Sequence, residues 1–218
     1  MRPFRDLEIR TYLAKQQDKM KKKIDSYTND EIMANSLDLL ADNLYEEFYI
    51  PPIVLYEEEV TRRTAEQTKR RRYADSFHQK IYGYQYIEVE GIEFSFYYPF
   101  EGDIGLFRCQ GSTFSLSGYP EIDISGHYIS MDYFRTYSEM EQLNAKEHLL
   151  KNVKSDYDSI VQGVGYVNSD VNSFNNSLRS VAMKLLQEKH KKISSFMNIQ
   201  TLFEIPVKKT NIVFPTFL

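Results

Sequence analysis

Residues 150–185 read LKNVKSDYDSIVQGVGYVNSDVNSFNNSLRSVAMKL, and this stretch decides the fold of the C-terminal third of the chain. Apolar residues recur in it at alternating steps of three and four, the spacing of one face of an α-helix. Five heptads of this pattern predict an unusually long helix that packs as a coiled coil or as a helical hairpin. The interaction and packing residues of this helix are Leu150, Val153, Tyr157, Ile160, Val164, Val167, Val171 and Phe174.

Two features interrupt this pattern. Gly163 and Gly165 each lower the helix propensity by roughly 1 kcal/mol relative to alanine. Asn175-Asn176-Ser177 is the stretch at which we expect the helix to break, with Ser177 capping a second helix that ends near Met197. The sequence therefore predicts helices over residues 138–197.

Two further helices are predicted before a sheet. Residues 5–27 predict a polar helix, and Thr28 or Asn29 caps a second helix that runs to Phe48. Pro51-Pro52 ends it, because proline lacks the N–H that a helix needs and restricts the residue before it.

The period of the apolar residues changes between residues 53 and 137. Short runs alternate between apolar and polar residues, and glycines separate them as turns. The alternating runs include Ile92–Tyr98, Thr113–Ser117 and Glu121–Ser125, and Gly105–Cys109 is a further run that is short and apolar. This arrangement predicts an antiparallel sheet of about five or six strands. The fold class is therefore α+β: residues 1–205 form a single module of helices (5–48), sheet (53–137) and helices (138–197), and residues 206–218 form a linker-like tail.

Composition narrows the class of protein. The 218 residues carry a net charge of −4, which argues against non-specific coating of nucleic acid. Cys109 is the single cysteine, so the chain cannot form an intramolecular disulfide. No signal peptide or apolar run long enough to span a membrane is present, so we expect a cytoplasmic protein without membrane contact.

Motifs for catalysis are missing. The sequence contains neither a P-loop nor the glycine-rich or nucleophile-elbow motifs of dinucleotide-binding and hydrolase folds, and its four histidines lack metal-ligand spacing. We therefore expect no cofactor and no metal. A hydrolase built on Cys109, or on carboxylates at Glu57–Glu59 and residues 121–132, is the third interpretation, since a lone cysteine more often packs as a small buried apolar group.

One basic segment stands out. It consists of Arg62, Arg63, Lys69, Arg70, Arg71 and Arg72, followed by Tyr73. Guanidinium groups beside an aromatic ring could bind phosphates and stack on bases, which makes a nucleic-acid-binding module the second interpretation. The competing interpretation is an exposed loop between a strand and the sheet.

The order of these features resembles an uncharacterised bacterial module found at the N-terminus of larger proteins. Some of those proteins look like anti-phage defence components in which a PD-(D/E)xK nuclease or another effector domain follows. The resemblance is carried by short motifs at Met1–Arg5, Tyr98–Asp103, Leu106–Leu116, Val171–Asn175 and Ile205–Lys209.

The resemblance implies a non-enzymatic sensor, regulatory or assembly module that acts on an effector through protein–protein contacts. It implies an effector protein or domain as partner, for which a nuclease is one candidate, and a homo-oligomer or hetero-complex. In the family the module ends near Pro206-Val207-Lys208-Lys209, whereas only Thr210–Leu218 follow here. We therefore expect either a fragment of a longer protein or a stand-alone version that works with a separately encoded effector.

Overall fold

The computed structural model describes residues 1–73, 83 and 86–201, and its chain forms two compact units. The first unit consists of Met1–Asp18 and Phe48–Leu178. The second unit consists of Lys19–Glu47 and the described residues from Arg179 onward. Each unit is built from two separate stretches of sequence, so a single cut in the chain isolates neither of them.

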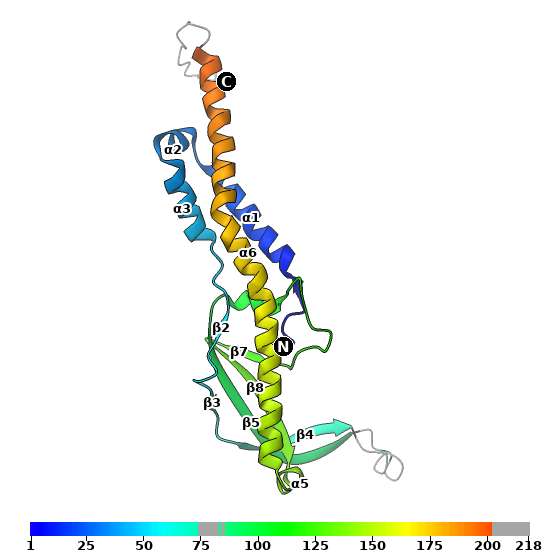
Figure 1. The fold of residues 1–218 in the computed structure, drawn as a ribbon. Helices are drawn as coiled ribbons and strands as arrows, with labels where there is room; N and C mark the ends of the chain where they lie inside the picture. Colours follow the sequence, from blue (N-terminus) through cyan, green and yellow to red (C-terminus); the bar gives the residue numbers. More distant parts are fainter. Residues whose placement is uncertain (74–82, 84–85, 202–218) are drawn as a thin grey trace, which may run out of the picture. The chain divides into compact units, whose positions relative to one another are not determined.

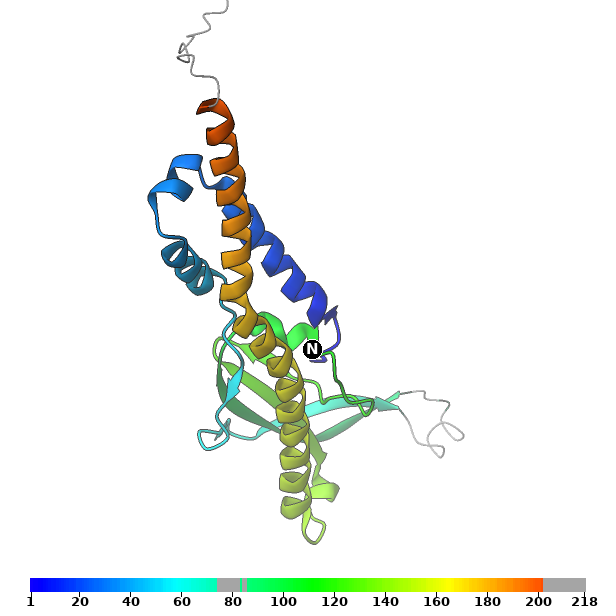
Figure 2. The same ribbon diagram turned by 45° about the horizontal axis from the view of Figure 1, so that its top comes forward.

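The first unit contains a six-stranded antiparallel sheet, which confirms the predicted α+β class. Its central strand β5 (Tyr86–Glu101) pairs with β8 along one edge and with β2, β3 and β4 in turn along the other, while β7 adds to β8. The other strands are β2 (Val54–Leu55), β3 (Thr61–Arg62), β4 (Glu66–Tyr73), β7 (Asp123–Ser125) and β8 (Tyr128–Thr136). In Figure 2, β4 and the first part of β5 run outward together from the rest of the sheet.

One face of this sheet forms the core of the first unit. Side chains alternate across a strand, so Phe94, Tyr98 and Phe100 of β5 lie on the same face and are buried. Ile129, Met131 and Tyr133 of β8 are buried as well, and Met131 and Tyr133 lie opposite Phe96 and Phe94. The first part of α6 (Ala145–Thr201) lies against this face (Figure 1). The rings of Tyr98 and Tyr157 stack there at 4.3 Å between centroids.

The apolar stripe of α6 packs largely at the predicted positions. Its buried members in the first unit are Val153, Tyr157, Ile160, Val164, Val167 and Val171, and Phe174 packs partly buried against them. Leu150 is 46% exposed, whereas its neighbour Leu149 is buried at 5%, so the stripe begins one residue earlier than predicted. This part of the stripe packs into the core of the first unit, which includes the buried face of the sheet.

The expected break at Asn175-Asn176-Ser177 is absent, and a single helix of 57 residues replaces the two that the sequence predicts. Asn175 is buried, and its side-chain amide accepts the Ile50 N–H (3.2 Å) and donates to the Ile50 carbonyl (2.8 Å). Asn168, two turns earlier, makes the same pair of bonds with Ile53 (2.9 and 2.7 Å). Because these amides are engaged by a distant segment, they do not compete for the backbone bonds of the helix.

The N-terminal region forms three helices instead of two: α1 (Ile9–Ser26), α2 (Asn29–Ala34) and α3 (Leu37–Phe48). Thr28 caps α2 as predicted, since its hydroxyl accepts the Glu31 N–H and the Glu31 carboxylate accepts the Thr28 N–H. Helix α2 ends at Asn35, whose side-chain amide donates a hydrogen bond to the Glu31 carbonyl (2.8 Å). Helix α1 begins at Ile9 instead of residue 5 because Leu7–Glu8 (β1) pairs with Cys109–Gln110 (β6).

Charged side chains hold the second unit together alongside its apolar core. The Lys189 ammonium donates to three carbonyls at the end of α1, those of Ile24 (2.8 Å), Asp25 (3.0 Å) and Tyr27 (2.6 Å). Arg179 pairs with Asp38 (3.0 Å) and Asp42 (2.6 Å) of α3. The buried apolar residues of the unit are Met20, Ile24, Ile32, Leu40, Ala41, Leu44, Ala182, Leu186 and Ile193.

Candidate binding site

The first six residues form a strap held by backbone hydrogen bonds. The Phe4 N–H donates to the Phe107 carbonyl (2.7 Å), and the Asp6 N–H donates to the Arg108 carbonyl (3.0 Å). Phe107 and Arg108 belong to the 3-10 helix η1 (Ile104–Arg108), in a run for which the sequence predicts a strand. Phe4 has φ 57°, in the left-handed region, which turns the strap so that the Phe4 side chain is buried.

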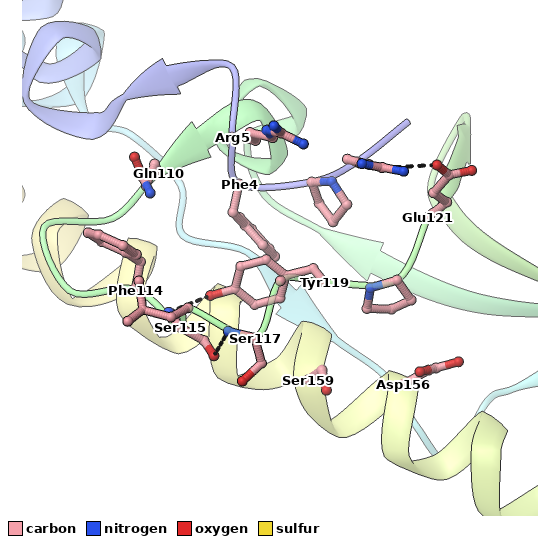
Figure 3. A pocket seen from close by; sticks show the side chains of 15 residues that line it. Phe4, Arg5, Gln110, Phe114, Ser115, Ser117, Tyr119, Glu121, Asp156 and Ser159 are labelled. Carbon is pink, nitrogen blue, oxygen red and sulfur yellow. Dashed lines mark hydrogen bonds and ion pairs between the residues drawn. The ribbon is translucent and has the colours of Figure 1, made fainter.

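The Phe4 ring fixes the strap to a loop and to α6. Its centroid lies 5.0 Å from that of Tyr119 in an edge-to-face arrangement and 6.0 Å from that of Phe107. Figure 3 shows the Phe4 and Tyr119 rings meeting above α6. A Cβ atom at Gly163 would lie 2.4 Å from the Phe4 ring and 2.8 Å from the Tyr119 ring. The glycine that weakens the helix in the sequence is therefore what lets both rings lie on the helix.

The loop between Gly111 and Pro120 is held at both ends. Near its start, the Asp170 carboxylate accepts the Ser112 N–H (2.7 Å) and the Ser112 hydroxyl (2.6 Å). Tyr119 holds its end through the packing with Phe4. Between these anchors Phe114 is 46% and Leu116 is 93% exposed. The sequence predicts a strand at Thr113–Ser117, but these residues form irregular backbone that ends in a turn at Leu116 and Ser117, and no strand of the described structure pairs with them.

A hollow of about 920 Å³ opens between the strap, this loop and α6 (Figure 3). Aromatic rings, serine hydroxyls and charged groups of both signs line it. We refer to it below as the strap hollow. Its lining residues are Arg2, Pro3, Phe4, Arg5, Gln110, Phe114, Ser115, Leu116, Ser117, Gly118, Tyr119, Pro120, Glu121, Asp156 and Ser159.

Three of the four charged residues that line the hollow have partners. Arg2 pairs with Glu121 at 3.0 Å, and the Asp156 carboxylate accepts the Tyr133 hydroxyl at 2.9 Å. That hydrogen bond and burial raise the pKa of Tyr133, with burial the larger cause. Arg5 is exposed and forms no ion pair with any residue that the structure describes. The hollow therefore carries one guanidinium whose charge the described fold leaves unmatched.

Cys109 is not among the residues that line the hollow, although its neighbour Gln110 is. Its side chain is buried, and its thiol donates weakly to the Gly105 carbonyl at 3.5 Å. Burial, followed by the charge of Asp103, raises the pKa of the Cys109 thiol to about 11. The nucleophilic form is the thiolate, so this environment keeps Cys109 in its unreactive form near neutral pH.

Of the carboxylates considered for a hydrolase, Asp123 and Asp132 line one pocket at the sheet, whereas Glu57 is not part of its lining. Glu57 pairs with Lys154 at 2.6 Å, and Asp123 lies 3.6 Å from the Met1 amino group. Within the described residues, no group of three or more His, Cys, Asp or Glu side chains could hold a metal ion. His78 lies outside the described residues. These side chains therefore do not assemble a site around the Cys109 thiol.

The predicted basic segment lies mainly on β4, where acidic residues neutralise much of it. Lys69 pairs with Glu90 (2.7 Å), Arg70 with Glu93, and Arg72 with Glu139 (3.7 Å) of α5 (Tyr137–Met140). Arg63 pairs with Glu66 at 3.2 Å. In the described structure, Arg62 and Arg71 make no ion pair. Nucleic-acid binding by this segment stays a prediction, but pairing lowers the charge that it presents.

Two arginines of this segment also cover an aromatic ring. The guanidinium carbons of Arg70 and Arg72 lie 5.6 Å and 4.9 Å from the ring centroid of Phe134, which is only 5% exposed. Gly91 makes room for that ring, since a Cβ there would lie 2.6 Å from it. The two arginines thus form part of the packing of the sheet.

Sequence reasoning did not identify the strap hollow. The motifs at Met1–Arg5 and Leu106–Leu116 contain part of its lining, but nothing local shows that residue 4 meets residue 119. No local signal marked the hollow, because Phe114 and Leu116 alternate with serines in the pattern of a strand.

Comparison with known proteins adds no family to this description. No protein-family model matches the chain, and neither a curated protein nor a solved structure matches it. In the described part of the chain, no helix combines the length and the apolar character that crossing a membrane requires. The α+β fold and the strap hollow therefore carry the functional argument.

Proposed function

We propose that this chain is a non-enzymatic sensor and regulatory module that acts on an effector protein or domain through protein–protein contacts. The observation that supports the proposal best is Leu116, a large apolar side chain that is 93% exposed on a loop held at both ends. An apolar side chain presented by an ordered loop suits the centre of an interface, because little conformational entropy is lost when a partner covers it.

The chemistry of the described residues also favours binding over catalysis. The Cys109 thiol is buried with a raised pKa, which lowers the population of the nucleophile that a hydrolase would need. In the first unit, the α6 stripe, which could have served a partner helix, packs into the protein's own core instead. We therefore expect the effector to contact exposed apolar side chains such as Phe114 and Leu116.

The resemblance of the short motifs to a bacterial anti-phage defence module supplies the biological setting of this proposal. In that setting the effector is a nuclease or another toxic activity, encoded in the same chain or separately. The module would assemble with it in the cytoplasm as a homo-oligomer or a hetero-complex.

The test is a quantitative affinity capture from the native host with the tagged full-length protein. Leu116→Asp should reduce recovery of a stoichiometric partner by on the order of tenfold or more, since truncating an anchor residue of an interface typically has an effect of this size. Leu143→Asp is the matched control, because Leu143 is 89% exposed but lies outside the loop.

Two results would contradict the proposal. One is a partner recovered equally well with Leu116→Asp, and the other is equal loss of the partner with both variants. Hydrolytic activity of the purified chain that disappears on alkylation of Cys109 would favour the hydrolase interpretation instead.

A further inference from the structure

Arg5 is held in place over the strap hollow by its neighbours. The N–H groups of Phe4 and Asp6, on either side of it, both bond to carbonyls of η1. The Arg5 backbone is therefore fixed, while its guanidinium has no ion-pair partner among the described residues. An unmatched guanidinium on a fixed stretch of backbone is a ready partner for a carboxylate or phosphate, which it can bind through two parallel hydrogen bonds.

The two acidic groups of the hollow already accept hydrogen bonds or ion pairs from the protein. Glu121 is paired with Arg2, and Asp156 accepts a hydrogen bond from the Tyr133 hydroxyl. Each of these carboxylates already has a donor from the protein. The Tyr133 hydroxyl is neutral, so Asp156 keeps its negative charge, and Arg5 is the unmatched positive charge that the hollow offers to an anion.

Two hydroxyl groups of the loop remain able to donate to a ligand. The Ser115 hydroxyl accepts the Ser117 N–H (3.3 Å), and the Tyr119 hydroxyl accepts the Ser115 N–H (3.4 Å), as the dashed lines in Figure 3 show. Since both oxygens act as acceptors within the loop, each retains its own proton for another acceptor. These donors add to the preference for a ligand with anionic or carbonyl oxygens.

The remainder of the lining suits a flat or apolar body. Phe4, Phe114 and Tyr119 contribute aromatic rings to the hollow. Its volume of about 920 Å³ is large enough for a small organic molecule. Eight of the fifteen lining residues are charged or polar, so the hollow offers placed polar groups beside its aromatic surface, and sites for such ligands use both.

We propose that the strap hollow binds a small organic anion with an aromatic body, with its carboxylate or phosphate at Arg5 and its ring against Phe114 and Tyr119. This ligand is the signal that the module senses, so the inference rests on the proposed function. The loop that lines the hollow with Phe114 and Tyr119 also presents Leu116 to solvent. Occupation of the hollow therefore changes the same loop that contacts the effector.

The experiment uses the ¹⁵N-labelled full-length protein and three probes of matched shape: naphthalene-2-carboxylate, naphthalene-2-carboxamide and 2-naphthylmethylamine. We expect the carboxylate to shift the amide resonances of Gln110 and Ser115–Tyr119 and to bind on the order of tenfold more tightly than the neutral amide, because it gains a charge-assisted hydrogen bond. The cationic amine should bind most weakly.

Two variants assign this preference to Arg5. Arg5→Gln should make the carboxylate and the carboxamide bind equally, whereas Arg62→Gln, which removes the same charge from an exposed residue of β3, should leave the preference intact. Equal affinities for the carboxylate and the carboxamide in the wild-type protein would overturn the proposal, and so would an equal effect of the two variants.

A third result would also overturn it in favour of a protein ligand. A peptide that ends in phenylalanine could bind at the hollow when naphthalene-2-carboxylate does not, which would assign the site to the C-terminus of a partner. The capture experiment with Leu116→Asp uses no probe. A failure of the ligand proposal can therefore be distinguished from a failure of the proposed effector contact.

Discussion

At the scale of single residues, the Asn175 side chain supplies the two hydrogen bonds that a neighbouring strand would otherwise make to a buried backbone segment. It satisfies both the N–H and the carbonyl of Ile50, which is only 1% exposed. Asn175→Ala leaves both groups buried without partners, so we expect urea denaturation to show a loss of about 2–4 kcal/mol of stability. Asn176→Ala is the control: Asn176 is exposed, and alanine should leave stability unchanged or slightly higher because it favours the helix. Equal losses in the two variants would refute this role of Asn175.

At the scale of an element, β4 separates the two roles considered for the basic segment. Arg70 and Arg72 cover Phe134, whereas Lys69 and Arg71 lie on the opposite face of the strand. We expect Arg70→Ala/Arg72→Ala to lower stability by about 1–3 kcal/mol, because it uncovers the ring and removes two ion pairs. Lys69→Ala/Arg71→Ala removes the same charge and should have a smaller effect, since it removes one exposed ion pair and the contact of Arg71 with the exposed ring of Tyr86.

The same two double variants test nucleic-acid binding. Thermal denaturation reports stability, and fluorescence anisotropy with a single-stranded oligonucleotide at several salt concentrations reports binding. If the segment binds phosphates, both variants should weaken binding and flatten its salt dependence. If the two double variants differ in stability but neither changes oligonucleotide binding, Arg70 and Arg72 serve only to pack the sheet.

The elements that the sequence predicts well are those whose signal is local. The alternation in β5 and the three-and-four spacing in α6 reflect which face of each element is buried, so both could be predicted from neighbouring residues. The continuity of α6 through Asn175 could not, because the Ile50 groups that engage its amide lie 125 positions away. The strap hollow was missed for the same reason: Phe4, Tyr119 and Gly163 meet only in the folded chain.

At the scale of the whole molecule, its two units allow stability to be altered in one part alone. Lys189 belongs to the second unit and donates to three carbonyls at the end of α1, where a cation also complements the helix dipole. Lys189→Met keeps the aliphatic part of the side chain but removes these bonds. We expect a loss of about 1–3 kcal/mol, confined to the second unit.

Hydrogen exchange measured by mass spectrometry tests this prediction, because it reports opening segment by segment. In Lys189→Met, amides of α2 and α3 should exchange faster, while those of β5 and β8 in the first unit should keep their wild-type protection. Lys184→Met, which removes an exposed lysine from the same stretch of α6, should leave both units unchanged. If protection instead falls equally in β5, β8, α2 and α3, the two units unfold as one cooperative body. The division of the chain would then describe its packing but not its unfolding.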